Sequence, residues 1–186
     1  MSRSVVLFAA VALILPTAAR GSAQQPPPIP NATGVVAFEG SVDKTYTDAG
    51  TLLVKASDGV RHLFHVTKKT AVHGAEAGFD GLAPGSRVVV HYTVDQGAKT
   101  AIEVDRVGGD GLREMEGVVR RVDRRSKQLS LELADGSRET LQLSERAAQY
   151  LGKDVERTPG SGRVIVYYTE EDGGKVAHYF KIVREE

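Results

Sequence analysis

The feature that most constrains the fold of this chain is an internal repeat. Three stretches recur further along the chain in the same order: 38–42 as 115–119, 58–61 as 135–138, and 87–93 as 163–169. The offset is 77 residues for the first two pairs and 76 for the third, so one net deletion separates the units. Ordered matches of this kind indicate two copies of one domain. We place the first copy at residues 34–108 and the second at residues 109–186.

Both copies show the hydrophobic alternation of β-strands. In the second copy Leu129 and Leu131 alternate with Ser130, and a period of two marks a strand with one face on a core. Asp-Gly pairs follow such strands at 58–59 and 135–136. A two-residue hairpin turn needs positive φ, which favours these residue types, so we predict a two-residue hairpin at each pair.

A longer connection separates the third strand of each copy from a fourth, β-branched strand at 88–90 or 164–166. In the second copy, Ser144 before 145–151 has the pattern of a capped short helix, whereas 67–83 in the first copy is richer in glycine. Turns at 95–97 and 172–174 then lead into a fifth strand. Each copy is therefore predicted as three strands, a helix or loop, and two more strands.

This order is typical of small five-stranded Greek-key barrels of the oligonucleotide/oligosaccharide-binding (OB) type. Gly40 and Gly117 lie in the first strands, where such a barrel bends sharply and glycine is tolerated. The predicted fold class is all-β, with two tandem OB-like barrels; SH3-like barrels are the alternative. A unit of this size buries only about 60% of its unfolded surface, so we expect the two copies to pack on each other.

The glycine, valine and turn pattern of 40–42, 50–54 and 82–88 resembles that of a family of small exported bacterial domains of unknown function. Those domains often occur in tandem behind a signal peptide and are thought to form OB-like barrels. The resemblance covers both copies, although the corresponding leucine–glycine element is degraded at 156–160. It implies the fold and export, and it implies no activity.

The N-terminal segment has the order of a secretory signal peptide. Arg3 precedes an apolar run from Val5 to Ala19, and small residues follow up to Ala23, after which we predict cleavage. The run is shorter than the roughly 20 residues that cross a bilayer, although a retained anchor is the alternative. Residues 1–23 are thus assigned to the signal peptide and 24–33 to a proline-rich tether. The predicted location is periplasmic or secreted, with no membrane span after cleavage.

Net charge narrows the possible partners, and the cysteine content limits how the fold can be stabilised. Of the 24 Lys and Arg residues, Arg3 and Arg20 lie in the predicted signal peptide, which leaves 22 against 24 Asp and Glu. A general nucleic-acid binder normally carries a basic excess, so a nucleic-acid partner is not expected. The chain has no cysteine, so its stability must come from packing without disulfides.

A basic stretch at the end of the first strand of the second copy is the sharpest candidate site. In an OB barrel the loop between strands one and two borders the usual ligand face, and arginine binds phosphate, sulfate or carboxylate with a bidentate fork. The alternative is a solvated hairpin whose charges pair with nearby carboxylates. The predicted anion-binding residues are Arg120, Arg121, Arg124, Arg125 and Lys127.

No other pattern predicts a specific chemistry. His62 and His65 lie three apart in a strand and point to opposite faces, and the other histidines are scattered, so we predict no metal site and no cofactor. Tyr92 and Tyr168 are in phase with the core valines. Tyr167 and Tyr179 are the tyrosines that face outward in this pattern, although packing is favoured over ligand stacking for all of them. No catalytic motif is present, and we predict that the protein is not an enzyme.

The sequence therefore predicts a non-catalytic exported binding module. Its ligand is not specified, but an anionic envelope macromolecule or a protein partner suits a neutral chain with one cationic loop. The alternative is a structural protein that self-assembles through exposed strand edges, such as those near Val104 or Phe180.

Overall fold

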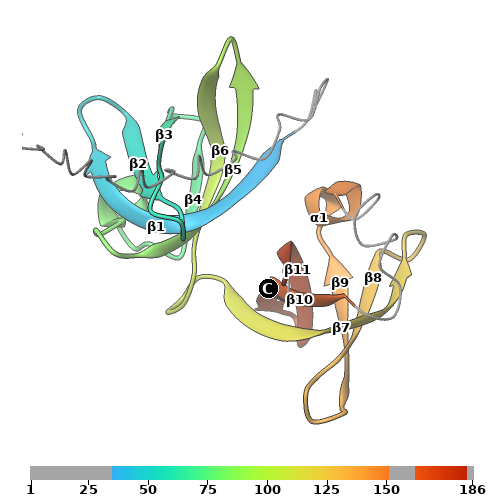
Figure 1. Cartoon of the computed structure of the whole chain (residues 1–186). Helices are drawn as coiled ribbons and strands as arrows, with labels where there is room; N and C mark the ends of the chain where they lie inside the picture. The colour runs from blue at the N-terminus through green and yellow to red at the C-terminus, as the bar shows by residue number, and fades with distance from the viewer. Residues whose placement is uncertain (1–34, 151–161, 184–186) are drawn as a thin grey trace, which may run out of the picture. The chain divides into compact units, whose positions relative to one another are not determined.

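The computed structural model describes residues 35–150 and 162–183 (Figure 1). The predicted signal peptide and tether, and the degraded element at 156–160, lie outside these residues. Within the described residues no helix is both long and apolar enough to cross a membrane.

The first copy forms a closed barrel of five strands in the order β1–β2–β3–β6–β5, and a short sixth strand, β4, extends the sheet beside β6. All its pairs are antiparallel except β3–β6 and β4–β6, which are parallel. Its elements are β1 (Val36–Tyr46), β2 (Thr51–Lys55), β3 (Arg61–His65), β4 (Ala71–His73), the 3-10 helix η1 (Gly78–Gly81), β5 (Arg87–Asp95) and β6 (Ala98–Arg106).

The second copy forms a closed barrel with the equivalent order, β7–β8–β9–β11–β10. Here too the third and fifth strands pair in parallel. Its elements are β7 (Arg113–Asp123), β8 (Gln128–Glu132), β9 (Arg138–Leu143), the helix α1 (Glu145–Tyr150), β10 (Arg163–Glu171) and β11 (Gly174–Ile182). The order one, two, three, five, four around a closed barrel confirms two tandem OB-like barrels.

Each barrel has its own core, built from the residues that alternate inward along its strands. In the first barrel Leu52, Val54 and Phe64 are completely buried, and Tyr92 packs against the same cluster. The core of the second barrel contains Leu129, Leu131, Leu141, Val166 and Tyr168. The period of two in the sequence thus identified the inward-facing residues, Tyr92 and Tyr168 included.

The first strand of each barrel is long and carries a β-bulge. Pairing of β1 shifts register between Val42 and Lys44, and β1 curves strongly (Figure 1). Gly40 precedes this bulge, and a Cβ atom there would lie 2.6 Å from Val54 Cγ1 and 2.7 Å from the carbonyl oxygen of Lys55. Glycine is required at position 40 because the next strand crosses too closely for any side chain.

The helix at the barrel closure of the second copy begins where the sequence predicts. The Ser144 hydroxyl accepts a hydrogen bond from the backbone N–H of Ala147 at 3.1 Å, which is an N-cap. In the first copy this connection contains β4 and η1 instead. The three residues of β4 were not foreseen as a strand, because so short a strand has no periodicity to detect.

The two Asp-Gly turns differ from the prediction. Ala56 donates to Val60 and Gly59 to Ala56, and only Gly59, at φ 84°, has positive φ in this loop. The loop therefore has three residues between the paired ends and closes on a left-handed glycine, as does the equivalent loop at Gly136. The two-residue hairpins are instead at Gln96-Gly97 and Asp172-Gly173, where both central residues have positive φ.

A third hydrophobic cluster joins residues from both copies. It contains Val89 of β5, Leu112 of the connection between the copies, and Tyr167 of β10, all nearly inaccessible. Tyr179 stacks on Tyr167 with ring centroids 5.5 Å apart. As the alternation predicts, Tyr167 points away from the core of its own barrel, but it is not exposed, because the third cluster buries it.

Candidate functional site

The predicted anion-binding residues lie in one hairpin. Arg120 and Arg121 lie in the turn-proximal part of β7, which ends at Asp123; Arg124 and Arg125 occupy the turn, and Lys127 precedes β8. The carboxylate of Asp123 holds the turn, since its Oδ1 accepts the backbone N–H groups of Arg125 and Ser126, both at 3.0 Å. As the sequence predicts, the stretch covers the end of the first strand of the second barrel, with Arg120 and Arg121, and the turn that follows it.

Several of these cations have carboxylate partners. Arg120 makes a bidentate pair with Glu132 of β8 at 3.1 and 2.8 Å, and the pKa of Glu132 is lowered chiefly by this hydrogen bonding. Arg121 pairs with Asp123 at 3.2 Å, and Lys127 pairs with Glu145 of α1. The pairing with Glu132 and Asp123 agrees with the alternative of a solvated hairpin.

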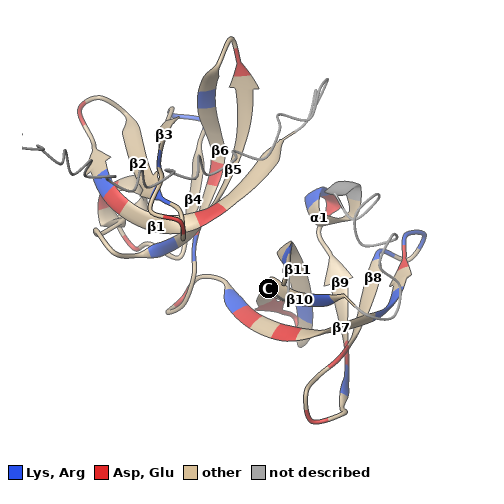
Figure 2. Ribbon diagram, in the orientation of Figure 1, with Lys and Arg blue, Asp and Glu red and all other residues tan. Residues whose placement is uncertain are grey.

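The hairpin gathers five cations in a short stretch of chain. Among the described residues, Arg120, Arg121 and Lys127 pair with the carboxylates of Glu132, Asp123 and Glu145. Arg124 and Arg125 are exposed at the turn, and blue residues gather there around one red position in Figure 2. Exposed ion pairs such as Arg121–Asp123 contribute little energy, so an incoming anion can exchange with the carboxylate at small cost.

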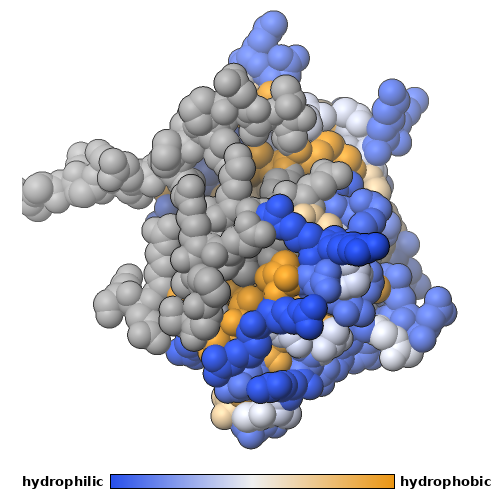
Figure 3. All heavy atoms as spheres, turned by 90° about the vertical axis from the view of Figure 1, so that its right-hand side faces the viewer, coloured by the Kyte–Doolittle hydropathy of each residue, from blue (hydrophilic) through white to orange (hydrophobic). Residues whose placement is uncertain are grey.

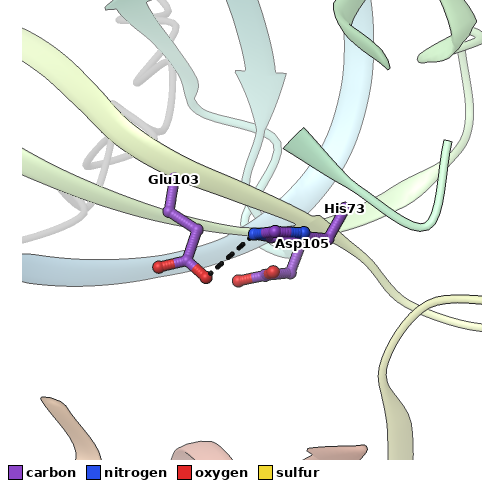
Figure 4. A group of neighbouring side chains, drawn as sticks. All are labelled: His73, Glu103 and Asp105. Carbon is purple, nitrogen blue, oxygen red and sulfur yellow. Dashed lines mark ion pairs between the residues drawn. The ribbon is translucent and has the colours of Figure 1, made fainter. Parts of the chain in front are cut away.

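A second group of polar side chains lies on the outer face of the first barrel. Glu103 and Asp105 are two residues apart on β6, so they share the face opposite to Val104, which is in the core. The pairing of β4 with β6 sets His73 directly beside Asp105, and His91 of β5 lies opposite Glu103. His73, Glu103 and Asp105 converge in Figure 4, with one ligand-type atom of each within 4.8 Å of the others.

The distances in this group exceed those of hydrogen bonds. His73 Nε2 lies 3.5 Å from Glu103 Oε1, and His91 Nε2 lies 3.6 Å from Asp105 Oδ2. Asp105 is only 3% exposed and His91 only 2%. Asp105 Oδ2 and His91 Nδ1 have no hydrogen-bond partner in the described part of the chain. A buried polar atom without a partner is costly, so this arrangement is unusual for a purely structural group.

Burial also shifts the protonation of these two side chains. Desolvation raises the pKa of Asp105 to about 7. Desolvation lowers the pKa of His91 to about 4, with smaller contributions from the charges of Arg146 and His178. The imidazole of His91 is therefore neutral at neutral pH, which is the state that accepts a proton or a metal ion.

Side chains of the second copy also approach the group. Arg146 of α1 makes an ion pair with Glu103 through Oε2, which leaves Oε1 directed to His73. An open hollow of about 230 Å³ is lined by His91, Glu103, Ser144, Glu145, Arg146 and His178. One side of the group is thus open to small solutes.

His62 lies elsewhere in the first barrel, whereas His178 lines the hollow and has partners of its own. His62 accepts a hydrogen bond from Lys99 at 2.8 Å, with its ring 4.5 Å from that of Phe38. The hydroxyl of Thr169 lies 2.8 Å from His178 Nε2, but Glu171 approaches the same nitrogen, at 3.9 Å. A catalytic triad requires the carboxylate on the other ring nitrogen, so this arrangement does not activate the hydroxyl.

Sequence reasoning missed the group on the outer face of the first barrel. The only signal was the Glu103-x-Asp105 spacing, which puts two carboxylates on one face of a strand. Carboxylates at this spacing are common on solvated faces and predict nothing alone. His73 was judged scattered because the pairing of β4 with β6 joins residues about 30 positions apart in the sequence.

Comparisons with known proteins leave the chain without a family. No protein-family description and no curated protein matches it. Among solved structures, a crystal structure of CusF with Ag(I) matches 39% of this chain and 97% of its own, at 11% identity and a TM-score of 0.32. A match this weak assigns neither fold nor ligand, so the fold assignment depends on the strand topology described above.

Proposed function

We propose that the protein is a non-catalytic exported binding module that recognises an anionic envelope macromolecule through the β7–β8 hairpin. The observation that carries the proposal is the turn held by Asp123, which presents Arg121, Arg124 and Arg125 at the surface. The β7–β8 hairpin lies on the right of Figure 1, the side that faces the viewer in Figure 3, where many hydrophilic residues lie beside separate hydrophobic areas.

The hairpin suits a polymer with repeated charges better than a single small anion. The guanidinium groups are exposed, so each contact with an anion is weak and screened by salt. Several weak contacts add up when the charges are linked in one chain. An acidic polysaccharide with spaced carboxylate or sulfate groups meets this requirement.

An NMR titration of isotope-labelled residues 24–186 tests the proposal. We expect uronic-acid or sulfated oligosaccharides to shift the signals of residues 120–127 at low salt, and the shifts to shrink at moderate salt. Neutral oligosaccharides serve as the negative control. Shifts that are absent, that are unaffected by salt, or that fall outside the hairpin would contradict the proposal.

A triple variant provides the matched test. R121A/R124A/R125A should weaken binding by about tenfold or more, because charge-assisted contacts to arginine contribute on the order of 1 kcal/mol each. K55A/K68A/K69A removes three exposed cations from the first copy and should bind like the unmodified protein. If both variants lost the same binding affinity, the loss would be explained by the lower net charge alone, and the hairpin would be rejected as the site.

Self-assembly through strand edges is the second candidate function. Val104 is not available for it, because β6 is paired with β5 on one side and with β4 on the other. Phe180 is different: β9 pairs with β11 only at Val176 and Ala177, so Phe180 has β10 as its strand partner in the described residues. Assembly that persists at high salt and is blocked by a proline at a position of β11 whose backbone N–H points away from β10 would favour this function.

A further inference from the structure

We propose that the outer face of the first barrel binds a divalent transition-metal ion, such as Zn²⁺, through His73, Glu103 and Asp105. The site is separate from the β7–β8 hairpin and does not depend on its function. It is built by β4 and β6, whose parallel pairing brings a histidine from one strand to two carboxylates of the other.

The distances between the side chains fit a shared ion better than direct bonding. Ligand atoms about 2.0–2.1 Å from a tetrahedral Zn²⁺ lie ~3.3 Å apart. The distances of 3.5 Å between His73 Nε2 and Glu103 Oε1 and of 3.6 Å between His91 Nε2 and Asp105 Oδ2 are near that spacing and too long for hydrogen bonds. The three ligand atoms all lie within 4.8 Å of one another, so they must approach one another by up to ~1.5 Å to share one ion.

The buried carboxylate supplies an independent reason. Asp105 is 3% exposed, and its Oδ2 has no hydrogen-bond partner among the described residues. Buried polar atoms in proteins normally have a hydrogen-bond partner or bind a metal ion. A cation at this position would satisfy Oδ2, and Nε2 of His91, 3.6 Å from Oδ2, provides a fourth donor.

The donor atoms indicate the class of metal. One or two imidazole nitrogens with two carboxylate oxygens suit Zn²⁺ and its divalent first-row neighbours, whereas soft ions prefer thiolate or thioether ligands. Arg146 holds Oε2 of Glu103, so this carboxylate presents Oε1 to the ion. With two carboxylates and one guanidinium, the group carries a net charge of −1 when both carboxylates are ionised, which favours a cation.

The test uses the tag-free chain after treatment with a chelator. Titration calorimetry with Zn²⁺ should give one site per chain, and Co²⁺ should produce a visible absorption band that Zn²⁺ removes. Signals of His73 and His91 should shift in NMR spectra as the ion is added. No binding of either ion, or a Co²⁺ band without shifts at these histidines, would overturn the proposal.

Single substitutions locate the site. His73→Ala, Glu103→Gln and Asp105→Asn should each weaken Zn²⁺ binding by at least about tenfold, since even the outer partners of metal ligands are worth about 10–100-fold. His65→Ala and Asp95→Asn remove an exposed histidine and an exposed carboxylate from the same barrel and should bind as before. Unchanged affinity in His73→Ala and Asp105→Asn would reject the site.

A stability measurement separates metal binding from a structural role of Asp105. The amide of Asp105→Asn has the shape of the carboxylate without its charge, so the metal-free variant should fold with a melting temperature at or above that of the unmodified chain. Saturating Zn²⁺ should raise the melting temperature of the unmodified chain and leave that of the variant unchanged. An equal rise in both would reject the assignment of Asp105.

Discussion

At the scale of single residues, the distance to neighbouring atoms and the charge of neighbouring groups decide which side chains each position accepts. Gly40 has no space for a methyl group because Val54 and the Lys55 carbonyl oxygen occupy it. Glu39, its neighbour, faces the opposite side and accepts hydrogen bonds from Arg87 at 2.9 Å and Lys181 at 3.0 Å. Neighbouring residues of one strand are thus constrained by packing on one face and by ion pairing on the other.

We expect Gly40→Ala to lower the free energy of unfolding by about 1–3 kcal/mol, the usual cost of overpacking. The added Cβ meets backbone, which cannot rotate away. Gly81→Ala is the matched control in the same barrel, since its nearest neighbours would lie at ordinary contact distance, 3.5 Å. Urea unfolding measures both, and equal stability of the two variants would show that β1 and β2 can separate locally.

Glu39 makes the stability depend on acid pH. Burial opposes its ionisation, but hydrogen bonds from Arg87, Lys181 and Tyr167 outweigh burial and lower its pKa below the ordinary 4.5. A lowered folded pKa stabilises the protein above about pH 4.5, and this contribution is lost as the pH falls through the folded pKa.

We therefore expect Glu39→Gln to be less stable than the unmodified chain near neutral pH and to lose less stability between about pH 5 and pH 3. Urea unfolding at several pH values measures this. Glu76→Gln, at an exposed position, should keep the acid dependence of the unmodified chain. Parallel pH profiles for Glu39→Gln and the unmodified chain would contradict the assignment.

At the scale of elements, turn chemistry sets the hairpins. The sequence correctly predicted the five barrel strands of each copy, the capped start of the helix and turns near 58–59, 95–97, 135–136 and 172–174, but it assigned two-residue turns to the wrong pairs. Aspartate before glycine suits both loop types, and the hydrogen bonds of Ala56 and Leu133 show that the longer loop forms at both Asp-Gly pairs. Loop length depends on strand register, which pairing across the barrel fixes.

The β5–β6 turn offers a direct test of this reasoning. Gln96 has φ 47° and Gly97 has φ 85°, as a type I′ turn requires. Gln96→Asn should stabilise the protein by a few tenths to about 1 kcal/mol, because asparagine tolerates the left-handed region better. Gly97→Ala should destabilise it by roughly 1 kcal/mol. Thermal unfolding of the two variants measures both effects. If both substitutions raised, or both lowered, the melting temperature, the result would contradict a type I′ turn.

At the scale of the whole molecule, the third hydrophobic cluster links the two copies. Leu112 is buried although it lies in the connection between the barrels, and it packs with Val89 and Tyr167. Each barrel alone has a small core, so burial of this cluster adds stability that neither core provides.

We expect Leu112→Ala to lower the free energy of unfolding by about 2–4 kcal/mol, the cost of deleting a buried leucine side chain. Leu63→Ala, at a position 47% exposed, should change it by less than about 1 kcal/mol. Chemical unfolding followed by signals from both barrels measures the difference. If Leu112→Ala and Leu63→Ala changed the free energy of unfolding by the same amount, the third cluster would contribute nothing to stability.

By itself the sequence determined the repeat, the strand order, the inward-facing residues and the five cations of one hairpin, because these depend on local periodicity and spacing. Only the tertiary structure decided the pairing of β4 with β6, the burial of Tyr167 and the carboxylate partners of the cations. Each depends on contacts between distant residues. The group of His73, Glu103 and Asp105 arises in this way, since only the folded sheet brings these residues together.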